Sequence, residues 1–248
     1  MAEFALDGKS LITPEAFLRE FAHPRPASQD AQFEEASAPL ALFLNFAPHN
    51  SLAKTAPASI IDRVATELHK IRLKYPSGIW QALIPMAQRH AVASFFLQDP
   101  FTHWSFTKPR GYSGDAELLD FIYGHPSVEP KLAAATEIGR ALYDYTKNAS
   151  SSVAVRERRD ILTARVDEVA DANGKQTEIF TIAAGHLREA ERPVALRENR
   201  IKRWVALDQD PASIQSIRNE YQGTAVEPID GTVRTVLGVA PKLGTFDL

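Results

Sequence analysis

The sequence contains no cysteine among its 248 residues, which excludes disulfides, thiolate nucleophiles, iron–sulfur clusters and cysteine zinc sites. It also lacks a strong charge of either sign, because the net charge is -3 and both signs are dispersed. Composition therefore gives no reason to expect nucleic acid or an anionic membrane as a partner. The apolar fraction is ordinary for a globular protein, and the length suits one large domain or two smaller ones.

Targeting and spanning segments are missing as well. The N-terminus has neither a basic start nor a long apolar core, so it does not resemble a secretory signal. No window of the sequence approaches the roughly 20 apolar residues that a spanning helix needs. We therefore expect a cytoplasmic protein without a membrane partner.

Motifs for several enzyme classes are absent. The sequence has no nearby histidine pair, no paired-carboxylate motif and no nucleophile elbow, so metal sites, glycosidases and serine hydrolases have no support. His103 and His186 are candidate general bases, although a lone histidine is more often structural. No metal site is predicted, and no pattern identifies a catalytic residue.

Helical periodicity dominates the first half of the chain. After Ser59, a candidate cap, apolar residues recur at helical spacing: Ile60, Ile61, Val64, Leu68 and Ile71. Residues 79–97 are apolar on most sides and predict a central helix with Pro85 as a candidate bend. A short buried helix is expected from Leu40 to Phe46. The first half is thus predicted to be all-helical.

Residues 99–115 differ in composition from the segments before them. They contain prolines, glycines and aromatic residues without periodicity, which predicts an ordered loop. Its glycines permit unusual dihedral angles, while Tyr112 and Asp115 offer a stacking face and a hydrogen-bond acceptor. Asp115 is also a candidate cap for a helix that begins at Ala116. A structural turn and a binding loop both explain this segment.

From Glu178 the apolar period changes from helical to that of strands, which places a domain boundary between residues 150 and 175. Three apolar runs, 178–182, 204–207 and 224–229, predict three strands. Small or acidic residues follow each run: Ala183 and Gly185, then Asp208, then Asp230 and Gly231. Because such groups meet at one edge of a parallel sheet, the pattern indicates a crevice that holds a nucleoside.

Asp208 lies about twenty residues beyond the small-residue turn, as the ribose-binding acid does in nucleotide-binding βαβ units. A carboxylate can accept from both ribose hydroxyls, which gives the residue a chemical role. Asp210 directly before Pro211 is the better helix cap, so Asp208 is left for a ligand. Asp230 can accept from an adenine amino group, although Asp230-Gly231 is equally a plain turn.

Together these segments resemble class I S-adenosylmethionine-dependent methyltransferases. Three runs carry a narrower likeness: KPRGYSGD at 108–115, AAGHLRE at 183–189 and ALDQDP at 206–211. They are similar to a bacterial group with a helical N-terminal domain, which includes fatty-acid (3-hydroxypalmitate) methyl ester synthases of quorum sensing. The resemblance extends from about Asp99 to the last residue.

The resemblance implies an α/β fold, with an all-helical N-terminal domain over residues 1–150, including the KPRGYSGD loop, and a truncated Rossmann-like domain over residues 151–248. It implies S-adenosylmethionine as the cofactor and a small-molecule methyl acceptor such as a fatty-acid carboxylate. The implied cofactor-binding residues are Ala183, Gly185, Asp208, Gln209, Asp230 and Gly231. Those implied for substrate contact or a lid are Tyr112, Gly114 and Asp115.

The sequence departs from the family pattern in two places. Ala183 and Leu187 stand at glycine positions of the motif, and Thr181 stands at its acidic position. Residues 245–248 coincide with the expected start of a fourth strand, so the first strand would lack a full partner. We therefore expect either that the chain is part of a longer protein, or that its own helices or a partner, as in an oligomer, cover this edge. In both cases we expect no methyl transfer by the chain alone.

Two other functions remain open. A non-catalytic cofactor-binding or regulatory protein would explain the altered glycine motif. A nicotinamide-dependent oxidoreductase would use the same arrangement of strand, turn and acid. The two missing glycines disfavour the oxidoreductase, because a pyrophosphate requires a closer approach of the backbone than a methionine does.

Overall fold

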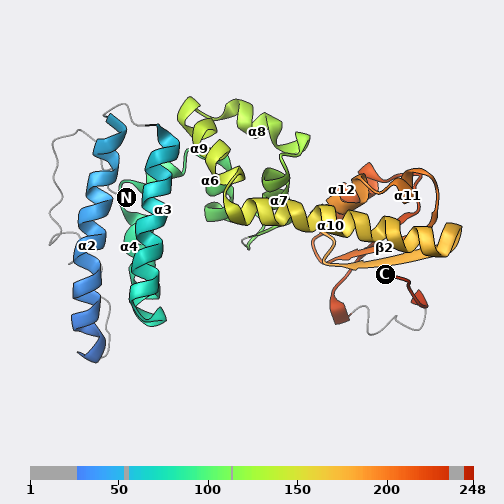
Figure 1. The fold of residues 1–248 in the computed structure, drawn as a ribbon, viewed down its shortest axis with the longest axis horizontal. Helices are drawn as coiled ribbons and strands as arrows, with labels where there is room; N and C mark the ends of the chain where they lie inside the picture. Colours follow the sequence, from blue (N-terminus) through green and yellow to red (C-terminus); the bar gives the residue numbers. More distant parts are fainter. Residues whose placement is uncertain (1–26, 53–55, 113, 235–242) are drawn as a thin grey trace. The chain divides into compact units, whose positions relative to one another are not determined.

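The structure is a computed structural model, and it describes residues 27–52, 56–112, 114–234 and 243–248 (Figure 1). Internal contacts divide the chain into two units. The first comprises Met1–Thr107 and Glu129–Thr146, and the second comprises Lys108–Val128 and Lys147–Leu248. By these contacts the KPRGYSGD loop, which the prediction grouped with residues 1–150, falls within the second unit.

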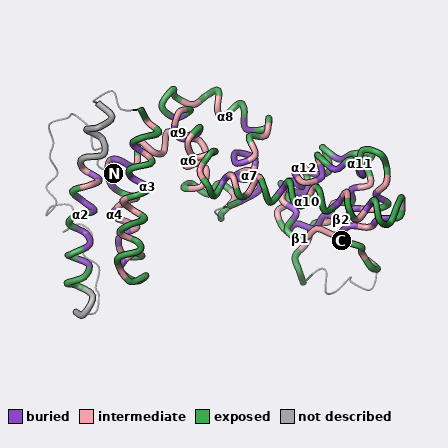
Figure 2. Tube along the Cα trace, in the orientation of Figure 1, coloured by how far each residue is buried: buried purple, intermediate pink, exposed green. Residues whose placement is uncertain are grey.

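The described part of the first unit consists of helices. They are α2 (Ala27–Leu52), α3 (Pro57–Lys74), α4 (Ser77–Arg89), α5 (Ala93–Phe96), α6 (Pro100–Thr107), α8 (Glu129–Ala134) and α9 (Glu137–Lys147). Helices α2, α3 and α4 contact one another and share an apolar core that contains Leu40, Leu44, Ile79, Leu83 and Met86. Figure 2 shows buried and exposed stretches alternating along α2, as expected for a helix with one apolar face.

Two of the predicted helices have different bounds in the structure. The helix expected at 40–46 is part of the longer α2, which continues through Pro39 because Phe33, Ala36 and Leu40 bury the same face. Helix α3 begins at Pro57 rather than after a Ser59 cap, since proline suits the first helical turn.

The segment from residue 79 to residue 115 also differs from the prediction. The predicted helix 79–97 ends at Arg89, and the imidazole Nδ1 of His90 accepts from Val92 N at 3.1 Å, which competes with continued helix. Part of the predicted loop is helix α6. Asp99 explains its start, because Asp99 Oδ1 accepts from Phe101 N at 3.0 Å, and Pro100 fits the first turn.

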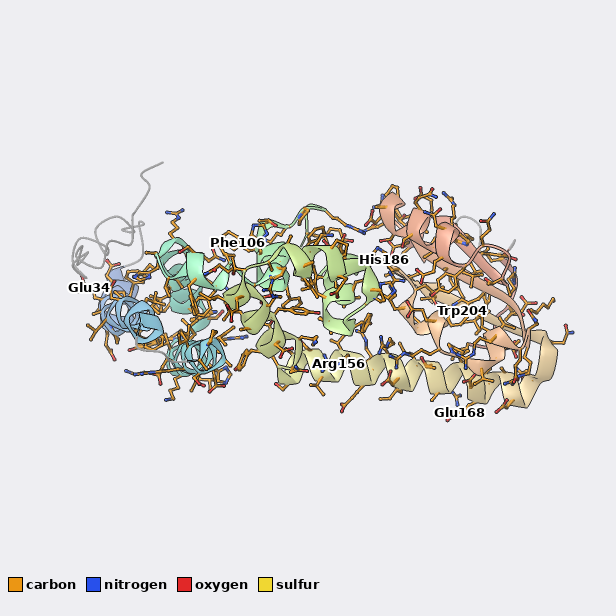
Figure 3. All side chains as sticks on the ribbon, turned by 90° about the horizontal axis from the view of Figure 1, so that it is seen from above. Glu34, Phe106, Arg156, Glu168, His186 and Trp204 are labelled. Atoms are coloured by element: carbon orange, nitrogen blue, oxygen red, sulfur yellow. The ribbon has the colours of Figure 1, made fainter. Side chains whose placement is uncertain are left out.

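The second unit combines helices with a small sheet. Its elements are α7 (Ala116–Tyr123), α10 (Ser150–Asn173), β1 (Thr177–Ile182), α11 (Val194–Arg197), β2 (Ile201–Asp208), α12 (Pro211–Glu220) and β3 (Val226–Asp230), with short 3-10 turns at Pro126–Val128, Gly174–Gln176 and Arg188–Glu191. Helix α10 contacts β1 and α7, while α12 contacts β2 and β3. Figure 3 shows Arg156 and Glu168 along the long α10 helix.

The three strands are parallel and lie in the order β1-β2-β3. All three coincide with the predicted runs, although β2 begins at Ile201 and so is longer than expected. Trp204, Val205, Ala206 and Leu207 are buried in the middle strand of the sheet. The chain thus has a helix-rich α/β fold in its described residues.

The second edge of β1 is bordered by the chain's own last residues. Phe180 N donates to Leu248 O at 2.9 Å, and Asp247 N donates to Glu178 O at 2.8 Å. The rings of Phe180 and Phe246 stack with their centroids 5.0 Å apart. The edge that the sequence predicted to need helices or a partner is therefore covered in part by residues 246–248. Among the described helices, none has the length and apolar character that crossing a membrane requires.

Candidate functional site

A cavity of about 320 Å³ lies at the carboxyl ends of the three strands, within the second unit. The register pairs Leu207 with Ile182 on one side and with Ile229 on the other, so the strand ends come together at one edge. The volume falls in the range of small-molecule sites. The lining residues are Tyr112, Gly114, Ala116, Leu119, Ile182, Ala183, Gly185, Leu207, Asp208, Gln209, Gly231, Thr232 and Val233.

Of the predicted cofactor-binding residues, five lie on this cavity and Asp230 does not. Asp230 ends β3 with an exposed side chain, whereas the next residue, Gly231, lines the cavity. Of the predicted substrate or lid residues, Tyr112 and Gly114 line the cavity. Asp115 is absent from the lining because its buried carboxylate caps α7, where it accepts from Leu118 N at 2.8 Å. The predicted cap is confirmed.

The turn after β1 is shaped by residues with left-handed backbone. Ala183, Gly185 and Leu187 have φ values of 55°, 56° and 55°. A Cβ atom at Gly185 would lie 3.2 Å from the Cβ of Ala116, so glycine also permits the close approach of α7. The short motif therefore keeps a glycine at the position where both backbone conformation and packing require one.

Asp208 connects all three strand ends. Its Oδ2 accepts from Gly185 N at 2.7 Å, and its Oδ1 accepts from Asp210 N at 2.8 Å. Its backbone carbonyl accepts from Gly231 N at 2.9 Å. Each carboxylate oxygen has a second lone pair, so Asp208 can hold the turns and still accept from a ligand. As predicted, the cap of α12 is a different residue, Asp210, which accepts from Ala212 N at 2.9 Å.

The amide groups of the turn are already used inside the protein. Ala184 N donates to Leu207 O at 3.0 Å, and Leu187 N donates to Ala184 O at 2.8 Å. Gly185 N donates to Asp208 Oδ2. Phosphate sites in nucleotide-binding folds use free amides at a helix N-terminus. Here three of the turn's amides point to protein acceptors, and only a short 3-10 turn follows.

The charge on the described part of the cavity wall is negative. Among the described lining residues Asp208 is the one charged side chain, and no lysine or arginine lines the cavity. Burial raises the pKa of the Tyr112 phenol above its ordinary value, and the nearby carboxylates of Asp210, Asp208 and Asp115 raise it further. A neutral or cationic ligand suits this environment better than a phosphate does.

A buried ionic cluster lies beside the turn. Arg188 Nε donates to Asp120 Oδ1 at 2.7 Å, and His186 Nδ1 contacts Asp120 Oδ2 at 2.8 Å. Ser127 Oγ donates to the same carboxylate at 3.0 Å. Burial would raise the pKa of Asp120, but the hydrogen bonds from His186 and Arg188 outweigh burial and hold it well below its ordinary value. The cluster joins α7 to the residues that follow β1.

Protein groups contact both ring nitrogens of His186. Arg110 Nη2 lies 3.2 Å from His186 Nε2, and a guanidinium can only donate, so Nε2 is the acceptor and the ring proton is on Nδ1. Both ring nitrogens are engaged and the residue does not line the cavity. The other candidate base, His103, is exposed on α6 of the first unit. The geometry does not support His186 as a general base for this cavity.

Three further residues have the composition of a metal site. His125, Glu191 and Glu220 place ligand atoms within 4.8 Å of one another, although the sequence predicted no such cluster. Arg188 Nη1 donates to Glu191 at 3.0 Å and also to Glu220. Because both carboxylates already accept hydrogen bonds from the Arg188 guanidinium, we assign this cluster to ion pairing.

Several residues of the site were not predicted from the sequence. Ala116, Leu119, Ile182, Leu207, Thr232 and Val233 line the cavity but were given no role there. Ile182 and Leu207 are the last apolar residues of predicted strands, so the topology already implied their position. Asp120 within the apolar run LLDFIY was a usable signal, because a lone acid among core residues needs a partner.

Comparisons with protein-family models, curated proteins and solved structures find no match to this chain.

Proposed function

We propose that the second unit binds S-adenosylmethionine in the cavity at the carboxyl ends of the strands, and that the protein is a methyltransferase for a small-molecule acceptor. In this proposal the three parallel strands form the first half of a Rossmann-like sheet. The observation that carries it is Asp208, an acid at the end of the second strand, which lines the cavity with lone pairs left for ribose hydroxyls.

The charge of the cavity distinguishes between nucleoside cofactors. A dinucleotide brings a pyrophosphate, which requires free backbone amides or basic side chains. The turn amides at 184, 185 and 187 are bonded within the protein, and the described lining has no basic side chain. S-adenosylmethionine carries a cationic sulfonium and no phosphate, so this wall favours it over a nicotinamide dinucleotide.

The residues present fit the parts of the cofactor. Asp208 would accept from the ribose, the turn 183–185 would lie against the nucleoside, and apolar Leu119 and Ile182 would exclude water. When bound, the cofactor supplies a methyl group that is already electrophilic, so the protein needs mainly to orient donor and acceptor. A carboxylate acceptor, such as that of a fatty acid, is ionised at neutral pH and needs no base.

A thermal-shift comparison tests the proposal. S-adenosylmethionine and S-adenosylhomocysteine should raise the melting temperature of the wild-type chain, whereas NAD should not. At 100 times the dissociation constant, binding adds about 2.7 kcal/mol to the free energy of unfolding. A shift with NAD alone would favour an oxidoreductase, and no shift with any of the three would refute the proposal.

A cavity-filling variant supplies the control. Ile182 is 49% exposed at the cavity, so Ile182→Trp should leave the fold intact while occupying ligand space. Ile161→Trp, on the 68% exposed Ile161 of α10, is the matched change outside the cavity. The thermal shift should disappear in Ile182→Trp and persist in Ile161→Trp. Equal shifts in both variants would place the ligand elsewhere.

A further inference from the structure

Arg110 joins three separate segments around the cavity. Its Nη1 donates to Asp210 Oδ2 at 2.7 Å and to Ser213 Oγ at 3.1 Å, both at the start of α12. Its Nη2 donates to His186 Nε2 at 3.2 Å and lies 3.5 Å from Glu117 Oε2 on α7. The guanidinium is largely buried, with 18% of the side chain exposed. A single side chain thus connects the chain after β1, the chain after β2 and the start of α7.

The segment that carries Arg110 has few other attachments. In its described residues, 108–112 and 114, the hydrogen bonds to other segments come from Arg110. The remaining one is local, from Gly111 N to Lys108 O at 2.8 Å. An added Cβ atom at Gly111 or Gly114 would meet no atom within 4 Å. These glycines therefore allow a positive φ angle, and close packing does not require them. All described residues of this segment except Arg110 are exposed, so packing contributes little to holding it.

Tyr112 lies two residues beyond Arg110 and lines the cavity, with 44% of its surface exposed. We propose that Arg110 is a positioning residue, which holds the Tyr112 ring at the cavity so that it can stack on the planar base of the bound ligand. Aromatic rings contribute to binding through such contacts. The affinity effect rests on the proposed function, whereas the position of Tyr112 can be tested without ligand.

The ligand-free test uses the sign of a pKa change. Burial and three carboxylates raise the Tyr112 pKa, while Arg110 lowers it. If Tyr112 stays in place in Arg110→Met, loss of the positive charge must raise its pKa further. If Arg110 holds it in place, Tyr112 moves into solvent and its pKa falls toward the ordinary value. Fluorine NMR of 3-fluorotyrosine protein, with the signal assigned by Tyr112→Phe among the six tyrosines, measures this titration.

A fall in the Tyr112 pKa is the expected result, and a rise would overturn the inference. Arg165→Met, on an exposed ion pair of α10, should leave the titration unchanged. Arg110→Lys keeps the positive charge but loses the forked geometry of the guanidinium. In this variant the Tyr112 pKa should fall only partly from its wild-type value. None of these outcomes depends on which ligand binds.

A double-mutant cycle then tests the connection to binding. If Arg110 acts through Tyr112, Arg110→Met and Tyr112→Ala should each weaken S-adenosylmethionine binding by about tenfold, and the double variant should also lose about tenfold. Additive losses of about a hundredfold would show that Arg110 acts independently of Tyr112 and would contradict the inference. Absence of binding by the wild-type chain would instead refute the proposed function and leave the NMR result to decide.

Discussion

Replacing Asp120 with alanine should lower the free energy of unfolding by about 3 to 5 kcal/mol, because it leaves buried charged and polar partners without their acceptor. Asp120 is fully buried and accepts from Arg188 and His186, which are themselves 4% and 8% exposed. Trp204, in the core of the second unit, reports this unfolding once Trp80 and Trp104 are replaced by phenylalanine. Urea denaturation followed by Trp204 fluorescence measures the change.

Glu168→Ala is the matched control for this experiment. Glu168 pairs with Arg165 on the surface of α10, where its side chain is 64% exposed. Exposed pairs of this kind contribute little to stability, so the control should leave the urea midpoint almost unchanged. A loss below about 1 kcal/mol in Asp120→Ala would contradict the structural role assigned to the buried cluster.

The same carboxylate makes stability depend on pH. The folded pKa of Asp120 is below its unfolded value, so its contribution is present above about pH 4 and is lost as the pH falls through the folded pKa. The difference in stability between wild type and Asp120→Asn should therefore be largest near neutral pH and should narrow below about pH 4. A difference that stays constant down to pH 2 would show that the pairing is not ionic.

Asp208→Ala should weaken S-adenosylmethionine binding by about ten- to a hundredfold, since charge-assisted hydrogen bonds contribute roughly 1.5 to 3 kcal/mol. The structure adds a second cause, because the substitution also removes the acceptors of Gly185 N and Asp210 N and so loosens the turn. Isothermal titration calorimetry measures the dissociation constant, with circular dichroism to show that the fold is retained.

Two further variants make the Asp208 result specific. Glu227→Ala removes an exposed acid from β3 in the same sheet and should not change affinity. Asp208→Glu keeps the charge but moves the carboxylate, so its loss should be smaller than that of alanine. Equal affinity in wild type and Asp208→Ala would remove Asp208 from the site.

The sequence was informative where local pattern determines structure. The strands were predictable because apolar β-rich runs end at small or acidic residues, and parallel strand ends share one edge. Ala183, Gly185, Asp208 and Gly231, which follow the predicted strands, all line one cavity in the structure. Asp115 and Asp210 were predicted as caps for the same reason, since capping depends on the next few residues alone.

The remaining features depend on contacts between distant residues. Asp120 bonds His186 and Arg188 across 66 and 68 residues, and Arg110 reaches Asp210 across 100. No local pattern specifies such partners, so Arg110 had no assigned role. Helix α6 was missed for a different reason. The prolines, the glycines and the lack of periodicity over residues 99–115 predicted a loop, although Asp99-Pro100 is a local start signal for a helix.

The most direct test of the central claim is a crystal structure of the chain with S-adenosylmethionine. The proposal predicts electron density for the nucleoside in the cavity between Tyr112, Gly185 and Gly231, with ribose oxygens within hydrogen-bond distance of the Asp208 carboxylate. Ligand density elsewhere on the protein, or an empty cavity at saturating ligand concentration, would contradict it.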